Sequence, residues 1–398
     1  VVLDAMNELA TMENDPTFGA VAASFNSNTV ASLTYSTVTT NTAVLAEGVG
    51  QTFALTTATD GAAIVGTTKD DIYNGSIVHA GTTDTLTSGD VMAGGEGADI
   101  LNITATGDTG ATTSSVSGIT TTGVETIVLT NLEADATAST LTLDTATMTG
   151  VNTFSVTNSA ANGEVTFSNV AALTNANMSA NAGDLTLTYL AAAVAGTADV
   201  QNISVSGTNG TFTADGVETI AITSSGSAAT LADVASDAVT KLTIAGDQNL
   251  TLTAAESIKT IDASALTGGL TMTAAAAAQT ITGGTGDDSF DMVGTLDKSD
   301  TLDAGDGTDT VKLSIAGTTV DATAVTGELI NVSNVEVYDV ASTNDAATLD
   351  LDGITGVTTL NAAANVKTYQ ITAVANSTAI SFVLNGTTYT TAATDADA

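Results

Sequence analysis

Two stretches of nine residues decide the fold: Gly-Gly-Glu-Gly-Ala-Asp-Ile-Leu-Asn at 94–102 and Gly-Gly-Thr-Gly-Asp-Asp-Ser-Phe-Asp at 283–291. Both match the pattern Gly-Gly-x-Gly-x-Asp-x-apolar-x at every fixed position. The glycines allow a tight turn whose carbonyl groups point inward, the aspartate adds a charged oxygen, and the apolar residue anchors the strand that follows. Because calcium takes six to eight oxygen ligands, a site needs two such turns stacked from successive coils.

Weaker copies of the turn lie beside each stretch, as stacking requires. Gly-Thr-Thr-Lys-Asp-Asp-Ile-Tyr at 66–73 precedes the first, and Asp-Ala-Gly-Asp-Gly-Thr-Asp-Thr-Val at 303–311 follows the second. We therefore predict two calcium-binding blocks. The predicted ligand residues are Gly66, Asp70, Asp71, Asp84, Asp90, Gly94, Gly95, Gly97 and Asp99 in the first block, and Gly283, Gly284, Gly286, Asp288, Asp303, Gly305, Gly307 and Asp309 in the second.

The two blocks are expected to differ in strength. Lys69 stands where the pattern has glycine, so substitution of Asp288 or Asp309 should weaken calcium binding more than substitution of Asp71. The alternative for each cluster is a glycine-rich surface turn with solvated aspartates. Two full matches with flanking partial copies favour calcium.

A short strand signature, Gly-Val-Glu-Thr-Ile, recurs between and after the blocks. It stands at 123–127 and 216–220, with looser copies at 150–156, 239–244, 257–261, 334–338 and 356–360. Successive copies at Val217, Val239 and Ile258 are separated by about one coil of a β-solenoid. The alternative is a β-sandwich whose strands share this pattern.

The fold expected is all-β, a parallel β-roll or β-solenoid with a short N-terminal helical segment, because period-two alternation and Thr-rich stretches dominate. Apolar residues near the N-terminus and from Leu231 to Val239 are spaced as in helices. The segments expected are a helical lead-in and linker at 1–45, a first calcium-binding block at 46–110, a Thr-rich solenoid at 111–280, a second calcium-binding block at 281–315 and a C-terminal β segment at 316–398.

The net charge of the chain restricts the classes of molecule that it can bind. The 398 residues contain 44 Asp and Glu against six Lys and no Arg, for a formal net charge of -38. Such a chain lacks the basic residues that neutralise nucleic-acid phosphates, and anionic membrane surfaces repel it. An apolar content of 43% indicates a folded protein, and the absence of cysteine excludes disulfides and thiolate metal sites. The apolar stretches are too short to span a bilayer, and no signal peptide is recognisable.

The order of these parts resembles the RTX-type surface-layer proteins of Gram-negative bacteria and related large RTX proteins. Thr-rich strands lead through 66–73 into the stretch at 94–104 and then into Gly-Val-Glu-Thr-Ile strands, and the resemblance covers most of residues 50–365. It implies a calcium-dependent chain that is exported unfolded by type I secretion, folds outside the cell and self-assembles into a two-dimensional lattice on the cell surface. Such proteins attach to outer-membrane lipopolysaccharide, but no anchoring region or C-terminal export signal is recognisable here.

Other functions fit the residues less well. His79 is the only histidine, so no His-Glu-x-x-His zinc motif or Ser-His pair can be assembled, and we expect His79 to be a solvated turn residue. A glycan-processing enzyme could use carboxylates alone, but the paired aspartates are better explained as calcium ligands. A secreted RTX adhesin remains the main alternative. Ice binding through Thr-x-Thr pairs such as Thr251/Thr253 and Thr271/Thr273 is a weaker one, because the pairs are irregularly spaced.

Overall fold

The computed structural model divides the chain into two compact units, Val1–Val49 and Gly50–Ala398. It describes residues 22, 49–60, 64–79, 83–107, 113–132, 139–253, 258–315, 319–321, 329–342, 348–350, 354, 356–362, 368–370, 381–384 and 387–390. The fold below is that of the second unit. The N-terminal helix predicted from the sequence lies outside the described residues.

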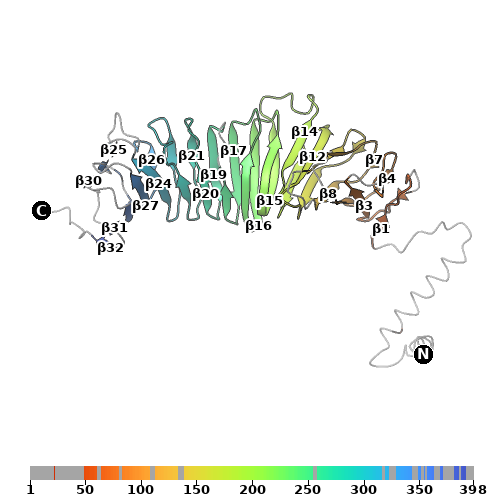
Figure 1. The fold of residues 1–398 in the computed structure, drawn as a ribbon, viewed down its shortest axis with the longest axis horizontal. Helices are drawn as coiled ribbons and strands as arrows, with labels where there is room; N and C mark the ends of the chain where they lie inside the picture. Colours follow the sequence, from red (N-terminus) through yellow and green to blue (C-terminus); the bar gives the residue numbers. More distant parts are fainter. Residues whose placement is uncertain are drawn as a thin grey trace, which may run out of the picture. The chain divides into compact units, whose positions relative to one another are not determined.

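Parallel strands stack along the second unit in a 25-stranded sheet, in which successive coils of the chain supply successive strands (Figure 1). One row of the stack begins with β1 (Thr52–Ala54), β3 (Ile72–Val78), β5 (Ile100–Thr106), β8 (Thr126–Asn131), β11 (Thr153–Thr157) and β13 (Asn175–Ser179). It continues through the first halves of β15 (Val200–Ala214) and β16 (Thr219–Val234) into β17 (Lys241–Gly246), β19 (Thr260–Leu266), β21 (Thr280–Thr282), β23 (Thr301–Asp303) and β26 (Val332–Ser333).

A second row of the same sheet runs beside the first. It contains β6 (Ser114–Val116), β9 (Ser139–Asp144), β12 (Gly163–Val170), β14 (Leu185–Tyr189), the second halves of β15 and β16, β18 (Leu250–Leu252), β20 (Leu270–Thr273), β22 (Ser289–Asp291), β24 (Thr310–Ile315), β27 (Val337–Ser342), β29 (Thr359–Ala362) and β31 (Ser381–Leu384). Strand β32 (Thr387–Thr390) pairs with β31 and makes the one antiparallel pairing among the described strands. The long strands β15 and β16 therefore join the two rows.

Two small parallel sheets lie on further sides of the coils. Near the first block the coils add β2 (Ile64–Val65), β4 (Val91–Ala93), β7 (Thr120–Thr122) and β10 (Met148–Thr149). Beyond the second block they add β25 (Thr319–Asp321), β28 (Thr348–Asp350) and β30 (Thr368–Gln370). In both blocks a short strand leads directly into the glycine-rich turn, which leads into a strand of the main sheet.

The core is a column of apolar side chains that repeats from coil to coil, because parallel in-register pairing places equivalent residues above one another. One column consists of Tyr73, Leu101, Ile127, Phe154, Ala176, Ile203, Ile222 and Ile244, all at most 2% exposed. Leu231, Leu252, Met272, Phe290, Val311, Tyr338 and Leu360 form the corresponding column in the second row. Each coil is thus stabilised mainly by its two neighbours.

The parallel stack confirms the predicted solenoid, and a β-sandwich, which pairs its strands antiparallel, is wrong. Val217, Val239 and Ile258 are each at most 1% exposed at the start of three successive coils, as the recurring signature predicted. The predicted helix from Leu231 to Val239 is also wrong. Residues 231–234 complete β16, where the buried Ala229 and Leu231 alternate with the more exposed Thr230 and Ala232, as in a strand.

Paired strands stand on both sides of the expected segment boundaries near residues 110, 280 and 315. The division into compact units lies after Val49. The two predicted blocks are therefore parts of one continuous stack. Among the described residues no helix is long and apolar enough to cross a membrane.

Candidate metal sites

In the first block a ladder of carboxylates connects three successive coils. The backbone amide of Asp71 donates a 2.6 Å hydrogen bond to Asp99 Oδ1, and the amide of Asp99 donates a 2.8 Å bond to Glu125 Oε2. Asp71 accepts the amide of Gln51 from the preceding coil in the same way, at 2.5 Å. Each side chain thus caps the amide that precedes a strand of the coil before it.

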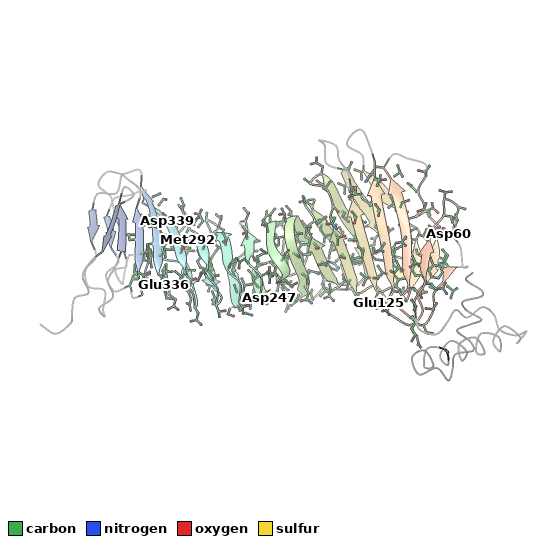
Figure 2. The ribbon with its side chains drawn as sticks, turned by 90° about the horizontal axis from the view of Figure 1, so that it is seen from below. Asp60, Glu125, Asp247, Met292, Glu336 and Asp339 are labelled. Atoms are coloured by element: carbon green, nitrogen blue, oxygen red, sulfur yellow. The ribbon has the colours of Figure 1, made fainter. Side chains whose placement is uncertain are left out.

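The second block repeats this arrangement. The amide of Asp288 donates a 2.8 Å hydrogen bond to Asp309 Oδ1, and the amide of Asp309 donates a 2.9 Å bond to Glu336 Oε2. Leu270 on the preceding coil donates its amide to Asp288 Oδ1 at 2.6 Å. Figure 2 shows Glu125 and Glu336 toward opposite ends of the stack, where Glu125 precedes β8 of the first row and Glu336 precedes β27 of the second.

Backbone conformation confirms that the two blocks are structural equivalents. Gly95 and Gly305 have φ of 108° and 98°, and Gly97 and Gly307 have φ of 133° and 134°. One coil later the match continues, with φ of 63° at Gly123 and 56° at Asn334, and two coils later φ is 93° at Gly150 and 90° at Gly356. These left-handed conformations favour glycine or asparagine, which explains why those residues recur at these positions.

One carboxylate oxygen in each block is buried without a hydrogen-bond partner. These are Asp99 Oδ2 and Asp309 Oδ2, in side chains that are 0% exposed. A buried carboxylate oxygen that lacks a partner is costly, so it indicates a ligand that would satisfy it. The two orphan oxygens occupy the same position in the two ladders.

Glycine residues and backbone carbonyl oxygens lie close to these carboxylates. A Cβ atom placed on Gly94 would overlap Asp99 Oδ2 and the carbonyl oxygen of Gly123. One placed on Gly66 would overlap Asp71 Oδ2 and the carbonyl oxygen of Gly94, and one on Gly283 would overlap Asp288 Oδ2 and the carbonyl oxygen of Ala304. Glycine therefore allows the backbone to approach closely where carboxylate and carbonyl oxygens converge.

The electrostatics of the ladder oppose ionisation in the absence of a cation. Burial raises the pKa of Asp309 to about 7, and the charges of Asp288 and Glu336 act in the same direction. Burial is also the main cause of the raised pKa values of Asp99 and Asp288. A bound divalent cation would reverse this effect by stabilising the charged carboxylates.

The chemistry of the donors fits a hard cation. Nitrogen and sulfur ligands are absent from the two ladders, and the oxygens come from carboxylates and backbone carbonyls, the set that calcium prefers. No group of three or more His, Cys, Asp or Glu side chains in the described part of the chain is arranged to hold a metal. A cation in these turns would therefore take most of its ligands from the backbone.

Several predicted ligand residues lie apart from the ladders. Asp84 Oδ1 caps the amide of Val78, and Asp90 accepts the amides of Asp60 and Thr87 at another corner of the coil. Asp303 accepts the side-chain amide of Asn334 at 2.7 Å. These three aspartates stabilise turns, and the spacing of the sequence alone did not separate them from Asp99 and Asp309.

Asp70 forms an outer row beside the first ladder. Its Oδ1 accepts the amide of Ala98 from the next coil at 2.9 Å, and Asp287 accepts the amide of Thr308 at 2.8 Å in the second block. Both side chains are exposed. They connect the paired turns from the solvent side.

Lys69 does not distort its turn. The equivalent Gly286 lacks the left-handed φ of Gly97 and Gly307, so this position does not require glycine for conformational reasons. The backbone conformation therefore gives no reason to expect weaker calcium binding in the first block than in the second. The blocks differ elsewhere, because Ala304 in the second block stands at the position of Gly94 in the first.

Sequence reasoning did not identify Glu125 and Glu336 as members of the site. The signal was present, because both are the glutamate of the Val-Glu motif that recurs along the chain. A third copy behaves alike: Glu218 Oε2 accepts the amide of Asp199 at 2.8 Å. The recurrence of the motif thus reflects a cap on the previous coil as well as strand pairing.

The expectation that His79 is a solvated turn residue is wrong. His79 is 2% exposed, its Nδ1 lies 2.8 Å from Ser114 Oγ, and its Nε2 lies 3.2 Å from Asn131 Oδ1. The ring is buried because polar partners from two later coils satisfy both nitrogens.

Comparison with known proteins does not assign the chain to a family. No family model matches the sequence, and no curated protein matches it significantly.

Proposed function

We propose that this chain is a calcium-dependent structural protein of the bacterial cell exterior, a subunit of a surface-layer lattice. The observation that carries the calcium part is the pair of buried, partnerless oxygens, Asp99 Oδ2 and Asp309 Oδ2, at equivalent places in two matched ladders. Independent turns with solvated aspartates would not leave the same oxygen buried and unsatisfied twice.

Calcium would join neighbouring coils in these blocks. Asp99 with the carbonyl of Gly123, and Asp71 with the carbonyl of Gly94, are the oxygens that would hold it in the first block. Asp309 and Asp288, with the carbonyl of Ala304, are their counterparts in the second. The bound ion supplies positive charge between carboxylates that otherwise repel one another.

The role on the cell exterior is supported by composition and by the resemblance to RTX-type surface-layer proteins. An elongated stack of coils with repeated strands is suited to a mechanical role, because each coil is stabilised by local contacts and the stack can be long. Extracellular calcium modules bind in a range of ~0.1 to 1 mM, which matches folding after export. Type I secretion and attachment to lipopolysaccharide are part of the same proposal.

Assembly in solution tests the lattice part. Calcium added to the purified chain should produce ordered sheets visible by negative-stain electron microscopy, and a chelator should disperse them. Sodium chloride at matched ionic strength is the control, because it screens charge without bridging carboxylates. A chain that stays monomeric in calcium while binding a surface or receptor would instead be an adhesin.

A further inference from the structure

The middle of the solenoid is poor in charge, in contrast to the second block. Residues 145–214 contain only three charged side chains, Glu164, Asp184 and Asp199. Residues 283–312 contain ten, of which eight are aspartates. Like-charge repulsion between copies of this acidic chain is therefore weakest around its middle coils.

Three exposed apolar side chains gather in this charge-poor region. Leu173, Leu190 and Val200 are 37%, 43% and 43% exposed. They are adjacent in sequence to Thr174, Tyr189 and Gln201, respectively, which form a hydrogen-bonded trio. The Tyr189 hydroxyl donates to Gln201 Oε1, and Gln201 Nε2 donates to the Thr174 carbonyl at 2.7 Å. The trio links the start of β13, the end of β14 and the start of β15, and so keeps Leu173, Leu190 and Val200 close together.

The connection after β14 enlarges this apolar surface, and Figure 1 shows a loop beside β14 that extends beyond the strand ends. Residues 190–198 contain no charged side chain, and Ala191, Ala192, Ala195 and Ala198 are exposed. The loop is held in place, since Val194 packs on the core and the amide of Gly196 bonds to Asp199 Oδ2 at 3.0 Å. We name Leu173, residues 190–198 and Val200 the apolar ridge.

We propose that the apolar ridge is a contact between two copies of this chain, ridge against ridge; this rests on the proposed lattice function. A basic partner would be attracted to the acidic blocks rather than to this uncharged surface, and an anionic surface would be repelled by the chain. A second copy needs a face where like charges are few, and a two-fold contact places the same ridge, with Asp199 as the one charged residue within 190–200, on both sides. Burial of the ridge supplies the attraction that charge does not.

Substitution of one ridge residue tests the contact on the full chain. Leu190→Asp should raise the protein concentration needed for calcium-induced assembly by about tenfold or more, because it places a charge at the centre of an apolar contact. Val293→Asp is the matched control, since Val293 is 47% exposed but lies in the acidic second block. Circular dichroism and the melting temperature in calcium verify that both variants fold. Ala192→Asp provides a second variant if Leu190→Asp does not fold.

Cross-linking gives a second readout. The chain has no cysteine, so Ala192→Cys or Val293→Cys introduces one unique thiol. A short bismaleimide should link Ala192→Cys protein into covalent dimers in calcium and leave Val293→Cys mainly monomeric. Normal assembly of Leu190→Asp, equal loss in Val293→Asp, or equal cross-linking at both sites would overturn the ridge contact while the lattice stands. A wild-type chain that stays monomeric in calcium would overturn both.

Discussion

The backbone amide of Asp309 donates its hydrogen bond to Glu336 Oε2 on the next coil, 2.9 Å away. Asp309 in turn accepts the amide of Asp288 from the coil before. The ladder therefore links each coil to the next through side-chain carboxylates that accept backbone amide hydrogen bonds. Glu336 ends the ladder, because it belongs to a Val-Glu strand signature rather than to a glycine-rich turn.

Removal of the cap should destabilise the second block. Glu336→Ala leaves the buried amide of Asp309 without its acceptor, which should lower the free energy of unfolding by about 1–3 kcal/mol. Glu336→Gln keeps an oxygen at this position and should cost less. Urea denaturation in calcium measures both variants, and equal stability of Glu336→Ala and the wild type would contradict the capping role.

Substitution of an aspartate that has a partnerless oxygen should weaken calcium binding more than substitution of a ladder aspartate whose two oxygens already accept amide hydrogen bonds. Asp99→Asn and Asp309→Asn should each lower the affinity of one block by about 10- to 100-fold. Asp71 and Asp288 accept backbone amides on both oxygens, so Asp71→Asn and Asp288→Asn should have smaller effects. Isothermal titration calorimetry with calcium decides the order, and a larger loss in Asp71→Asn than in Asp99→Asn would refute it.

Adding a methyl group in the first block and removing one in the second should affect calcium binding differently. Gly94→Ala places a Cβ atom against Asp99 Oδ2 and the carbonyl of Gly123, so it should disrupt the first block and lower its calcium affinity. Ala304→Gly removes the equivalent methyl group and should leave calcium binding intact or strengthen it. Calcium titration of both variants measures this difference, and unchanged affinity in Gly94→Ala would show that the ion does not use this space.

The metal-free protein should lose stability as pH rises. The pKa of Asp309 is about 7 in the folded chain, above the unfolded value of ~3.9. Its contribution to stability is therefore fully present below the unfolded pKa and is lost as pH rises through about 7. In chelator, the melting temperature should be higher at about pH 5 than at about pH 8, and Asp309→Asn should reduce this difference. A wild-type melting temperature that rises over this interval would contradict the prediction.

The sequence predicted the parallel solenoid because each coil repeats a strand pattern, and Val217, Val239 and Ile258 mark the same place in successive coils. It also identified Asp71, Asp99, Asp288 and Asp309, whose turns need glycine beside a carboxylate. It could not separate these from Asp84, Asp90 and Asp303, because ladder and corner aspartates have similar neighbours in the sequence. Which oxygen finds an amide depends on the register between coils, and that register arises from packing across about 20 to 30 residues.

The burial of His79 shows the same limit. Its partners, Ser114 and Asn131, lie 35 and 52 residues later in the chain, so no local pattern connects them. The wrongly predicted helix at 231–239 has a related cause. Its apolar residues are spaced as in a helix, but pairing with β15 and β18 holds residues 231–234 in an extended strand. Contacts with neighbouring coils determine both the burial of His79 and the strand conformation of residues 231–234.

Thermal unfolding in calcium and in chelator tests the central claim most directly. If calcium joins the coils at Asp99 and Asp309, the melting temperature should rise steeply as calcium passes through ~0.1 to 1 mM, and magnesium should have a much weaker effect because it demands tighter octahedral geometry. The double variant Asp99→Asn/Asp309→Asn should lose most of this response. Identical melting curves of the wild type in calcium and in chelator would contradict the account.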